Sequence, residues 1–259
     1  MFGTRLHMKK FLRITTIVIV VLVAIVFAAG FFLNESKPEG TPGPEADALA
    51  RKMMAAIDHA AWDTTAVVSW DFGGRQQHIW DRERHFAEVR WADGEENFRS
   101  QVDINARTGL LWKNGEAVTD PAARDKGVDF AWKKWVNDSF WLNPVSKVFD
   151  PGTERSLVKL DDGSEALMIT YTSGGDTPGD SYLWMLDENG LPTSWKMWVS
   201  IIPIGGMEFT WEDWQTFDTG VKLSETHVGP FTLKLTDIQV ADSLGKMFPE
   251  GDPFAELVE

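Results

Sequence analysis

The segment YLWMLDENGLPTSWKMWV, residues 182–199, decides the fold. Two runs of alternating residues flank Asn189-Gly190, a pair that supplies the positive φ angles of a tight hairpin. Three of the chain's 13 tryptophans lie in these 18 residues, and large apolar side chains fall on both faces of the predicted strands. Such a hairpin needs cover on both faces. We therefore expect it to be one wall of a curved sheet, with helices or a lipid against its concave face and a smaller cover on the other face.

The same pattern recurs on both sides of this hairpin. Asp93-Gly94, Asn114-Gly115 and Asp162-Gly163 predict further tight turns between alternating segments. About a dozen short strands in succession form an antiparallel meander, and a sheet of so many strands tends to curl. The expected fold class is therefore mainly β: an open, curved antiparallel half-barrel of about a dozen strands, with helices that plug or cover its concave face.

Two segments have helical rather than strand periodicity. Pro44 opens a predicted helix that runs to about His59, and residues 121–142 predict one or two short helices that end before Pro144. The apolar residues at helical spacing are Leu49, Met53, Ile57 and Ala60 in the first segment and Val128, Ala131, Trp132, Trp135 and Val136 in the second.

Residues 14–33 form an uncharged run of 20 residues, long enough as a helix to span the roughly 30 Å hydrocarbon layer. Basic residues in the preceding segment, 1–13, predict that this segment is cytoplasmic and that the rest of the chain is extracytoplasmic. A cleaved signal peptide is the alternative, with a cleavage site near Ala28-Ala29-Gly30. We favour a retained single-pass anchor in the cell membrane with a periplasmic domain; cleavage would give a periplasmic or secreted protein.

Composition divides the remainder of the chain. Residues 34–44, NESKPEGTPGP, are typical of a linker, residues 45–242 form the predicted β domain, and residues 243–259 form an acidic tail. The absence of cysteine excludes disulfides, thiolate metal sites and a lipid-modified N-terminal cysteine. The formal net charge of −14 argues against nucleic acid as a partner.

The order of these elements, from about Glu45 to Val240, resembles the LolA/LolB lipoprotein-carrier superfamily. The similar segments are HIWDRERHFAEVRW (78–91), TGLLWKNGE (108–116), VDFAWKKWVNDSFW (128–141) and LDENGLPTSWKM (186–197). The resemblance implies an open half-barrel whose helices plug an apolar cavity that accepts acyl chains or a lipid-bearing ligand. A membrane anchor is incompatible with a soluble shuttle, so we expect a tethered receptor, sensor or partner subunit.

Large aromatic and methionine side chains are the candidate ligand site. Those predicted to line a cavity are Trp70, Phe72, Trp80, Trp91, Phe98, Trp132, Trp135, Tyr182, Trp184, Trp195, Met197, Phe209 and Trp211. Arg82 and Arg84 are candidates for a basic rim that holds an anionic head group, although ion pairs on a solvated hairpin are the simpler explanation for them. A dry core packed by helices is the alternative to a cavity.

Motifs for catalysis or metal binding are missing from the sequence. The five histidines have no H-x-x-x-H or H-E-x-x-H spacing, and no serine lies in G-x-S-x-G. We therefore predict no metal, no cofactor and a non-catalytic protein that binds a lipid or acylated ligand. One alternative is a protein-interaction or sensor module with a dry core. The other is a glycan-binding or glycan-cleaving domain, which would expose several of Trp62, Trp112, Trp141, Trp198 and Trp214.

Overall fold

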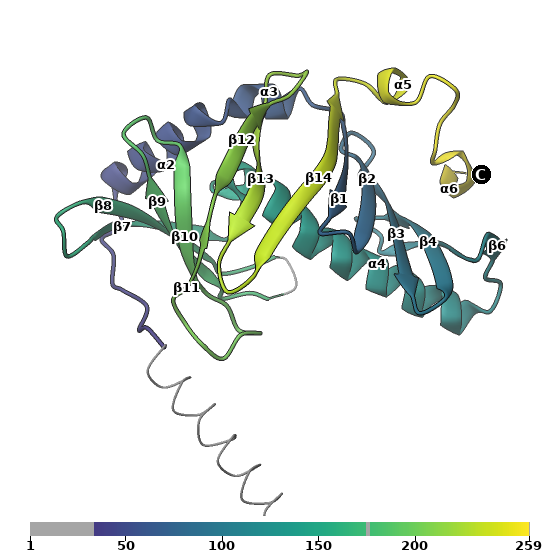
Figure 1. The fold of residues 1–259 in the computed structure, drawn as a ribbon, viewed down its shortest axis with the longest axis horizontal. Coiled ribbons are helices and arrows are strands. Elements are labelled where there is room, and N and C mark those ends of the chain that lie inside the picture. The colour runs from purple at the N-terminus through teal and green to yellow at the C-terminus, as the bar shows by residue number, and fades with distance from the viewer. Residues whose placement is uncertain (1–33, 175–176, 259) are drawn as a thin grey trace, which may run out of the picture.

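A computed structural model describes residues 34–174 and 177–258, and Figure 1 shows their fold, with the element labels used below. The predicted cytoplasmic segment 1–13 and the predicted anchor or signal 14–33 lie outside the described residues. Within the described parts of the chain, no helix combines the length and hydrophobicity needed to cross a membrane.

Nine strands form the larger antiparallel sheet. In spatial order they are β12 (Glu212–Thr216), β13 (Lys222–Val228), β14 (Thr232–Ala241), β1 (Val67–Phe72), β2 (Gln76–Asp81), β3 (Phe86–Asp93), β4 (Glu96–Asp103), β5 (Thr108–Lys113) and β6 (Glu116–Ala117). The smaller sheet has the order β11 (Met207–Thr210), β10 (Pro192–Trp198), β9 (Ser181–Leu186), β8 (Glu165–Tyr171) and β7 (Thr153–Lys159). Neither sheet closes into a barrel.

The prediction of a mainly β fold with open antiparallel sheets is confirmed. Each sheet is a meander apart from the pairing of β14 with β1, and the predicted turns carry the positive φ angles that they require, as at Asn114 and Gly115. The strands nevertheless divide into two sheets, where the sequence predicted one. The division falls between β11 and β12, which are short. Across it the Val228 amide still donates to Thr210 Oγ1 at 3.0 Å, so the two sheets adjoin at this seam.

Helix α4 (Pro121–Leu142) connects β6 to β7, the outermost strands of the two sheets, and Figure 1 shows it running along one face of the larger sheet. The prediction of one or two short helices is corrected to one helix of 22 residues. The Asp120 side chain caps it by accepting from the Ala123 amide at 2.8 Å. A Cβ on Gly127 would lie 2.4 Å from Leu111 Cδ2, so glycine lets the helix lie close against β5.

The first predicted helix ends earlier than expected. Helix α2 covers Pro44–Ala56, and a separate short helix, α3, covers His59–Asp63. Asp58 separates them because it adopts a left-handed φ of 53°, and its side chain accepts from the Ala61 amide to start the second helix. A 3-10 turn, η1 (Pro144–Lys147), follows α4, and two one-turn helices, α5 (Leu244–Met247) and α6 (Ala255–Val258), lie near the C-terminus.

The helices divide the interior into two hydrophobic cores. Helix α4 packs with Trp70, Trp80 and other side chains of the larger sheet. Helix α2 packs with Trp184, Trp195 and other side chains of the smaller sheet. Trp141, near the end of α4, contacts both cores and joins them.

The hairpin 182–199 is β9–β10, and both of its faces are covered as predicted. The inner face carries Tyr182, Trp184, Trp195 and Met197 and lies in the core under α2. The outer face carries Leu183 in a smaller cluster with Val158, Ala166 and Met168.

The predicted linker is held against the smaller sheet, at its outer face and at its β7 edge. Thr41 exchanges backbone hydrogen bonds with Leu157 at 2.8 and 2.9 Å, and Trp198 Nε1 donates to the Glu35 carbonyl at 2.8 Å. Residues 34–41 therefore cover part of the smaller sheet, and the contacts of the chain begin well before α2.

Candidate ligand pocket

A pocket of about 390 Å³ lies between α4 and the ends of β8 and β9. Its apolar walls are Trp132, Trp135, Val136 and Phe140 from α4 and Tyr171 and Tyr182 from the two strands. Ile201, which is 72% exposed, lies at the same pocket. The pocket is thus placed where α4 leaves the larger sheet to reach the smaller one.

Three aromatic rings form a continuous wall of the pocket. The ring centroid of Phe140 lies 5.4 Å from that of Tyr171 and 5.0 Å from that of Tyr182. Tyr182 in turn lies 4.6 Å from Trp195, which has no exposed surface. The wall is therefore supported from behind by the core under α2, and such rigid aromatic surfaces suit an apolar ligand.

The tyrosines at the pocket are neutral. Burial raises the pKa of Tyr171 well above its ordinary value, with further contributions from Tyr182 and Asp150, and burial also raises the pKa of Tyr182. The Tyr171 hydroxyl is buried and has no hydrogen-bond partner among the described residues. The aromatic wall therefore carries no charge at any physiological pH.

Charged groups also line the pocket, and they are paired within the protein. Lys147 Nζ lies 3.5 Å from Asp150 Oδ2. Asp180 accepts from the Ser200 amide at 2.8 Å and from the Thr177 hydroxyl at 2.5 Å. Lys133, which also lines the pocket, pairs with Asp129 at 2.9 Å. The pocket therefore combines apolar walls with polar and charged groups, a combination typical of ligand pockets.

The structure distributes the predicted cavity residues over four places. Trp132, Trp135 and Tyr182 line the pocket. Trp70, Phe72 and Trp80 are buried in the core under α4, while Trp184, Trp195, Met197, Phe209 and Trp211 are buried in the core under α2. Trp91 and Phe98 stack on each other at 5.2 Å and border a second hollow, on the larger sheet.

The two arginines of the predicted rim lie elsewhere. Arg82 donates to the backbone carbonyls of Trp62 and Thr65, and burial lowers its pKa to about 10. Arg84 pairs with Asp81 and with Asp252 of the C-terminal tail. Both guanidinium groups are thus engaged in holding the chain together, and neither lines the pocket.

Three residues of the apolar wall, Val136, Phe140 and Tyr171, were not among the predicted ligand residues. Val136 and Phe140 continue from Trp132 at i, i+4 spacing, which forms a second apolar stripe along α4. This stripe was the signal that could have identified them. Tyr171 ends β8, and nothing in the local sequence marks it as a pocket residue.

A buried histidine–aspartate pair was also missed. His78 Nε2 on β2 lies 2.8 Å from Asp138 Oδ2 on α4, and both side chains are at most 1% exposed. The His78 ring stacks on Trp70 at 4.4 Å, and Asn137 Nδ2 donates to the other carboxylate oxygen at 2.8 Å. Asp138 occupies the same face of α4 as Ala131, Trp135 and Leu142, so a polar residue within an apolar stripe was the available signal.

Changing Asp138 to alanine is expected to lower the free energy of unfolding by about 1–3 kcal/mol, because His78 Nε2 would lose its partner while remaining buried. Combining this change with His78→Phe should recover part of the loss, since both partners are then apolar. A double-mutant cycle measured by urea unfolding checks this coupling. Strictly additive losses would show that the two side chains do not interact.

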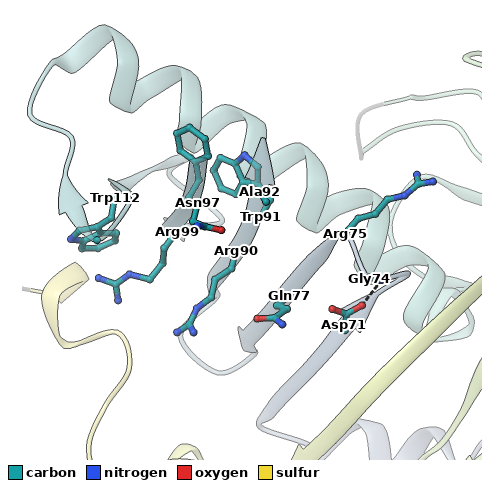
Figure 2. A pocket seen from close by; sticks show the side chains of 12 residues that line it. Asp71, Gly74, Arg75, Gln77, Arg90, Trp91, Ala92, Asn97, Arg99 and Trp112 are labelled. Atoms are coloured by element: carbon teal, nitrogen blue, oxygen red, sulfur yellow. Dashed lines mark hydrogen bonds between the residues drawn. The ribbon is translucent and has the colours of Figure 1, made fainter. Parts of the chain in front are cut away.

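Figure 2 shows a second hollow, of about 610 Å³, on the outer face of the larger sheet. Five side chains form a row across β1 to β5 there: Asp71, Gln77, Arg90, Arg99 and Trp112. Arg90 Nη2 lies 2.6 Å from the buried carboxylate of Glu88, and the Arg99 guanidinium stacks over Trp112 at 3.7 Å. This hollow is polar and charged, so it does not suit an apolar ligand.

The tryptophans that a glycan-binding surface would expose are not exposed in this structure. Trp62 and Trp112 are buried, and Trp141, Trp198 and Trp214 are half-buried. Across residues 34–174 and 177–258, no group of three or more His, Cys, Asp or Glu side chains is arranged to hold a metal ion.

Among solved structures, the chain has a remote likeness to a protein of unknown function. No family model and no curated protein matches the sequence. A crystal structure of a DUF1329 family protein from Desulfovibrio piger is similar with a TM-score of 0.36 and 11% identity, over 79% of this chain and 95% of that chain. A likeness of this degree assigns neither a family nor a function to the chain.

Proposed function

We propose that this domain binds a lipid or acylated molecule, with its apolar chain in the pocket between α4 and β8–β9. The observation that carries the proposal is the uncharged aromatic wall of Phe140, Tyr171 and Tyr182. The volume of about 390 Å³ falls within the roughly 300–1,000 Å³ of known ligand pockets. Residues 14–33 would tether the domain to the membrane with the pocket on the extracytoplasmic side.

The proposed function is non-catalytic. The His78–Asp138 pair has the residue types of an acid–base site, but both side chains are sealed between β2 and α4 and have no path to a substrate. At the pocket, the tyrosines are neutral, both carboxylate oxygens of Asp180 already accept hydrogen bonds, and Asp150 is paired with Lys147. Binding without chemistry fits these groups best.

A protein-interaction or sensor module remains the second candidate, because ten of the thirteen predicted cavity residues lie outside the pocket and eight of them are buried in packed cores. The two functions differ in what occupies the pocket. A sensor with a dry interior needs no ligand there, whereas a lipid-binding domain does.

Photo-crosslinking tests the proposal. The full chain in membrane vesicles is treated with a diazirine-labelled fatty acid, irradiated and digested, and the labelled peptides are mapped by mass spectrometry. We expect label in residues 132–140 and in 171–174 or 177–182. Val136→Asp should reduce labelling there severalfold, because a carboxylate in an apolar pocket opposes the entry of an alkyl chain.

Val228→Asp is the matched control, since it makes the same chemical change at an exposed valine on β13, away from the pocket. It should leave the labelling of residues 132–140 unchanged. Label confined to residues 1–33, or equal labelling of the two variants at α4, would refute ligand binding in this pocket.

A further inference from the structure

The acidic tail is attached to the outer face of the larger sheet by a specific set of contacts. Arg84 Nη1 and Nη2 donate to the two carboxylate oxygens of Asp252 at 2.7 and 2.9 Å, which is a bidentate pair. Asp252 Oδ1 also accepts from the Phe254 amide at 2.8 Å, so Asp252-Pro253-Phe254 forms a compact turn. The turn presents its aspartate and its phenylalanine to the sheet together.

Phe254 fills an apolar site on this face. Its side chain has no exposed surface, its ring lies 6.0 Å from that of Phe86, and the Arg84 guanidinium lies 5.7 Å from the ring centroid. Aromatic anchors buried in a pocket beside an arginine are typical of the residues that dominate protein interfaces. Phe254 therefore has the character of an interface residue, although it belongs to the same chain.

The sheet supplies buried polar groups that recognise the backbone of the turn. Gln101 has no exposed surface, and its Nε2 donates to the Pro253 carbonyl at 2.6 Å and to Glu88 Oε2 at 2.7 Å. Further along the tail, Glu256 Oε1 accepts from Arg99 Nη2 at 3.1 Å. The sheet thus binds four groups of the tail in sequence order: the Asp252 carboxylate, the Pro253 carbonyl, the Phe254 ring and the Glu256 carboxylate.

Residues 242–251, which join β14 to the Asp252-Pro253-Phe254 turn, are held much more lightly than the turn. None of residues 242–251 is buried, and in the described structure their hydrogen bonds stay within the segment, as between the Phe248 amide and the Leu244 carbonyl. Residues 252–256 can therefore leave the sheet without disrupting any packed core beyond the contacts of Phe254 itself. Their attachment is equivalent to the binding of a tethered peptide, which competes with free peptide at an effective concentration on the order of millimolar.

We propose that this face, between the β2–β3 turn and β4, is a binding site for an Asp-Pro-Phe segment of a second protein chain, and that the tail of this chain is its intramolecular competitor. The partner is an acidic segment with the spacing Asp-Pro-Phe-x-Glu. Its carboxylates complement Arg84 and Arg99, and its aromatic ring replaces Phe254.

A labelled peptide tests this site in the full chain. The probe is fluorescein-labelled PEGDPFAELV, the sequence of residues 249–258, and its binding to the detergent-solubilised full chain is followed by fluorescence anisotropy. Phe254→Ala in the protein should tighten peptide binding about tenfold or more relative to the wild type, because the weakened tail competes less well. Peptide with alanine in place of its phenylalanine should not bind.

Arg84→Ala in the Phe254→Ala background should abolish peptide binding, because the bidentate partner of the aspartate is lost. If Phe254→Ala does not fold, peptide binding is measured instead in wild-type protein that carries a protease site inserted between residues 245 and 246. After cleavage at this site, the labelled peptide should displace the cut tail. A folded Phe254→Ala protein or a cleaved wild type that fails to bind the peptide would overturn the proposal. Equal peptide affinity of wild type and Phe254→Ala would also overturn it.

Discussion

Replacing Trp195 with alanine is expected to lower the free energy of unfolding by about 3–5 kcal/mol, the largest effect of any substitution considered for this domain. Trp195 has no exposed surface and lies at the centre of the core under α2. Its ring contacts five others, those of Phe140, Trp141, Tyr182, Trp184 and Trp211. Loss of the indole would leave a cavity that rigid neighbouring rings cannot fill. Urea unfolding followed by circular dichroism measures the loss.

Trp198→Ala is the control on the same strand. Trp198 lies on the opposite face of β10, is half-buried, and loses one hydrogen bond to the Glu35 carbonyl when truncated. We expect it to be the milder change, with a loss of about 1–2 kcal/mol. A loss for Trp198→Ala that equals or exceeds that for Trp195→Ala would show that the inner face of the hairpin is not the main core.

The second large effect is a loss of stability at acidic pH caused by His227. This side chain is fully buried beside Trp211, and burial lowers its pKa to about 4, against the opposing effect of a hydrogen bond with the Thr210 backbone. In the unfolded chain the histidine titrates near 6.5. Below that pH the unfolded chain binds a proton that the folded chain does not, so stability falls as pH decreases from about 6.5 to about 4. The expected loss of unfolding free energy over this pH range is about 3 kcal/mol.

His227→Gln isolates this contribution, because glutamine does not titrate. The difference in unfolding free energy between pH 7.5 and pH 4.5 should be smaller in the variant by about 2–3 kcal/mol. The carboxylates with lowered pKa, such as Asp47 and Asp252, change the stability at lower pH, and they do so equally in both proteins. An identical pH dependence in wild type and variant would show that His227 is not held neutral by its surroundings.

Much of the fold could be predicted from the sequence, because its strongest signals are local. Asn-Gly and Asp-Gly pairs placed the hairpins, and alternation assigned Trp184 and Trp195 to one face of β9–β10. Helical spacing located α4, although it did not predict that residues 121–142 form a single helix. The interruption at Asp58 also escaped prediction, because a left-handed φ at an aspartate within a helical pattern has no signal of its own in the sequence.

The pocket was harder to predict because it depends on where α4 lies against the two sheets. An excess of tryptophan identifies a large interior, but it does not separate residues packed against a helix from residues beside a cavity. Trp70 and Trp135 are both buried aromatic residues in the same core, yet only Trp135 also lines the pocket. That distinction arises from the crossing of α4 between the sheets, a contact between residues distant in the sequence.

The attachment of the C-terminal tail to the outer face of the larger sheet could not be predicted from the sequence either. Its composition is acidic and its hydrophobic pattern is weak, so the sequence indicated no attachment. Phe254 is nevertheless buried, because Arg84 and Gln101 on the sheet provide matching partners for Asp252 and Pro253. A single anchoring aromatic residue has no periodicity, and sequence patterns detect burial only where it repeats.

Native mass spectrometry of the full chain, released from detergent micelles, tests most directly whether the pocket holds an apolar ligand. The ligand-binding account predicts one lipid or acyl adduct that persists on wild type and on Val228→Asp and that is lost from Val136→Asp. Wild-type protein released without any adduct, or an adduct retained equally by all three proteins, would contradict it.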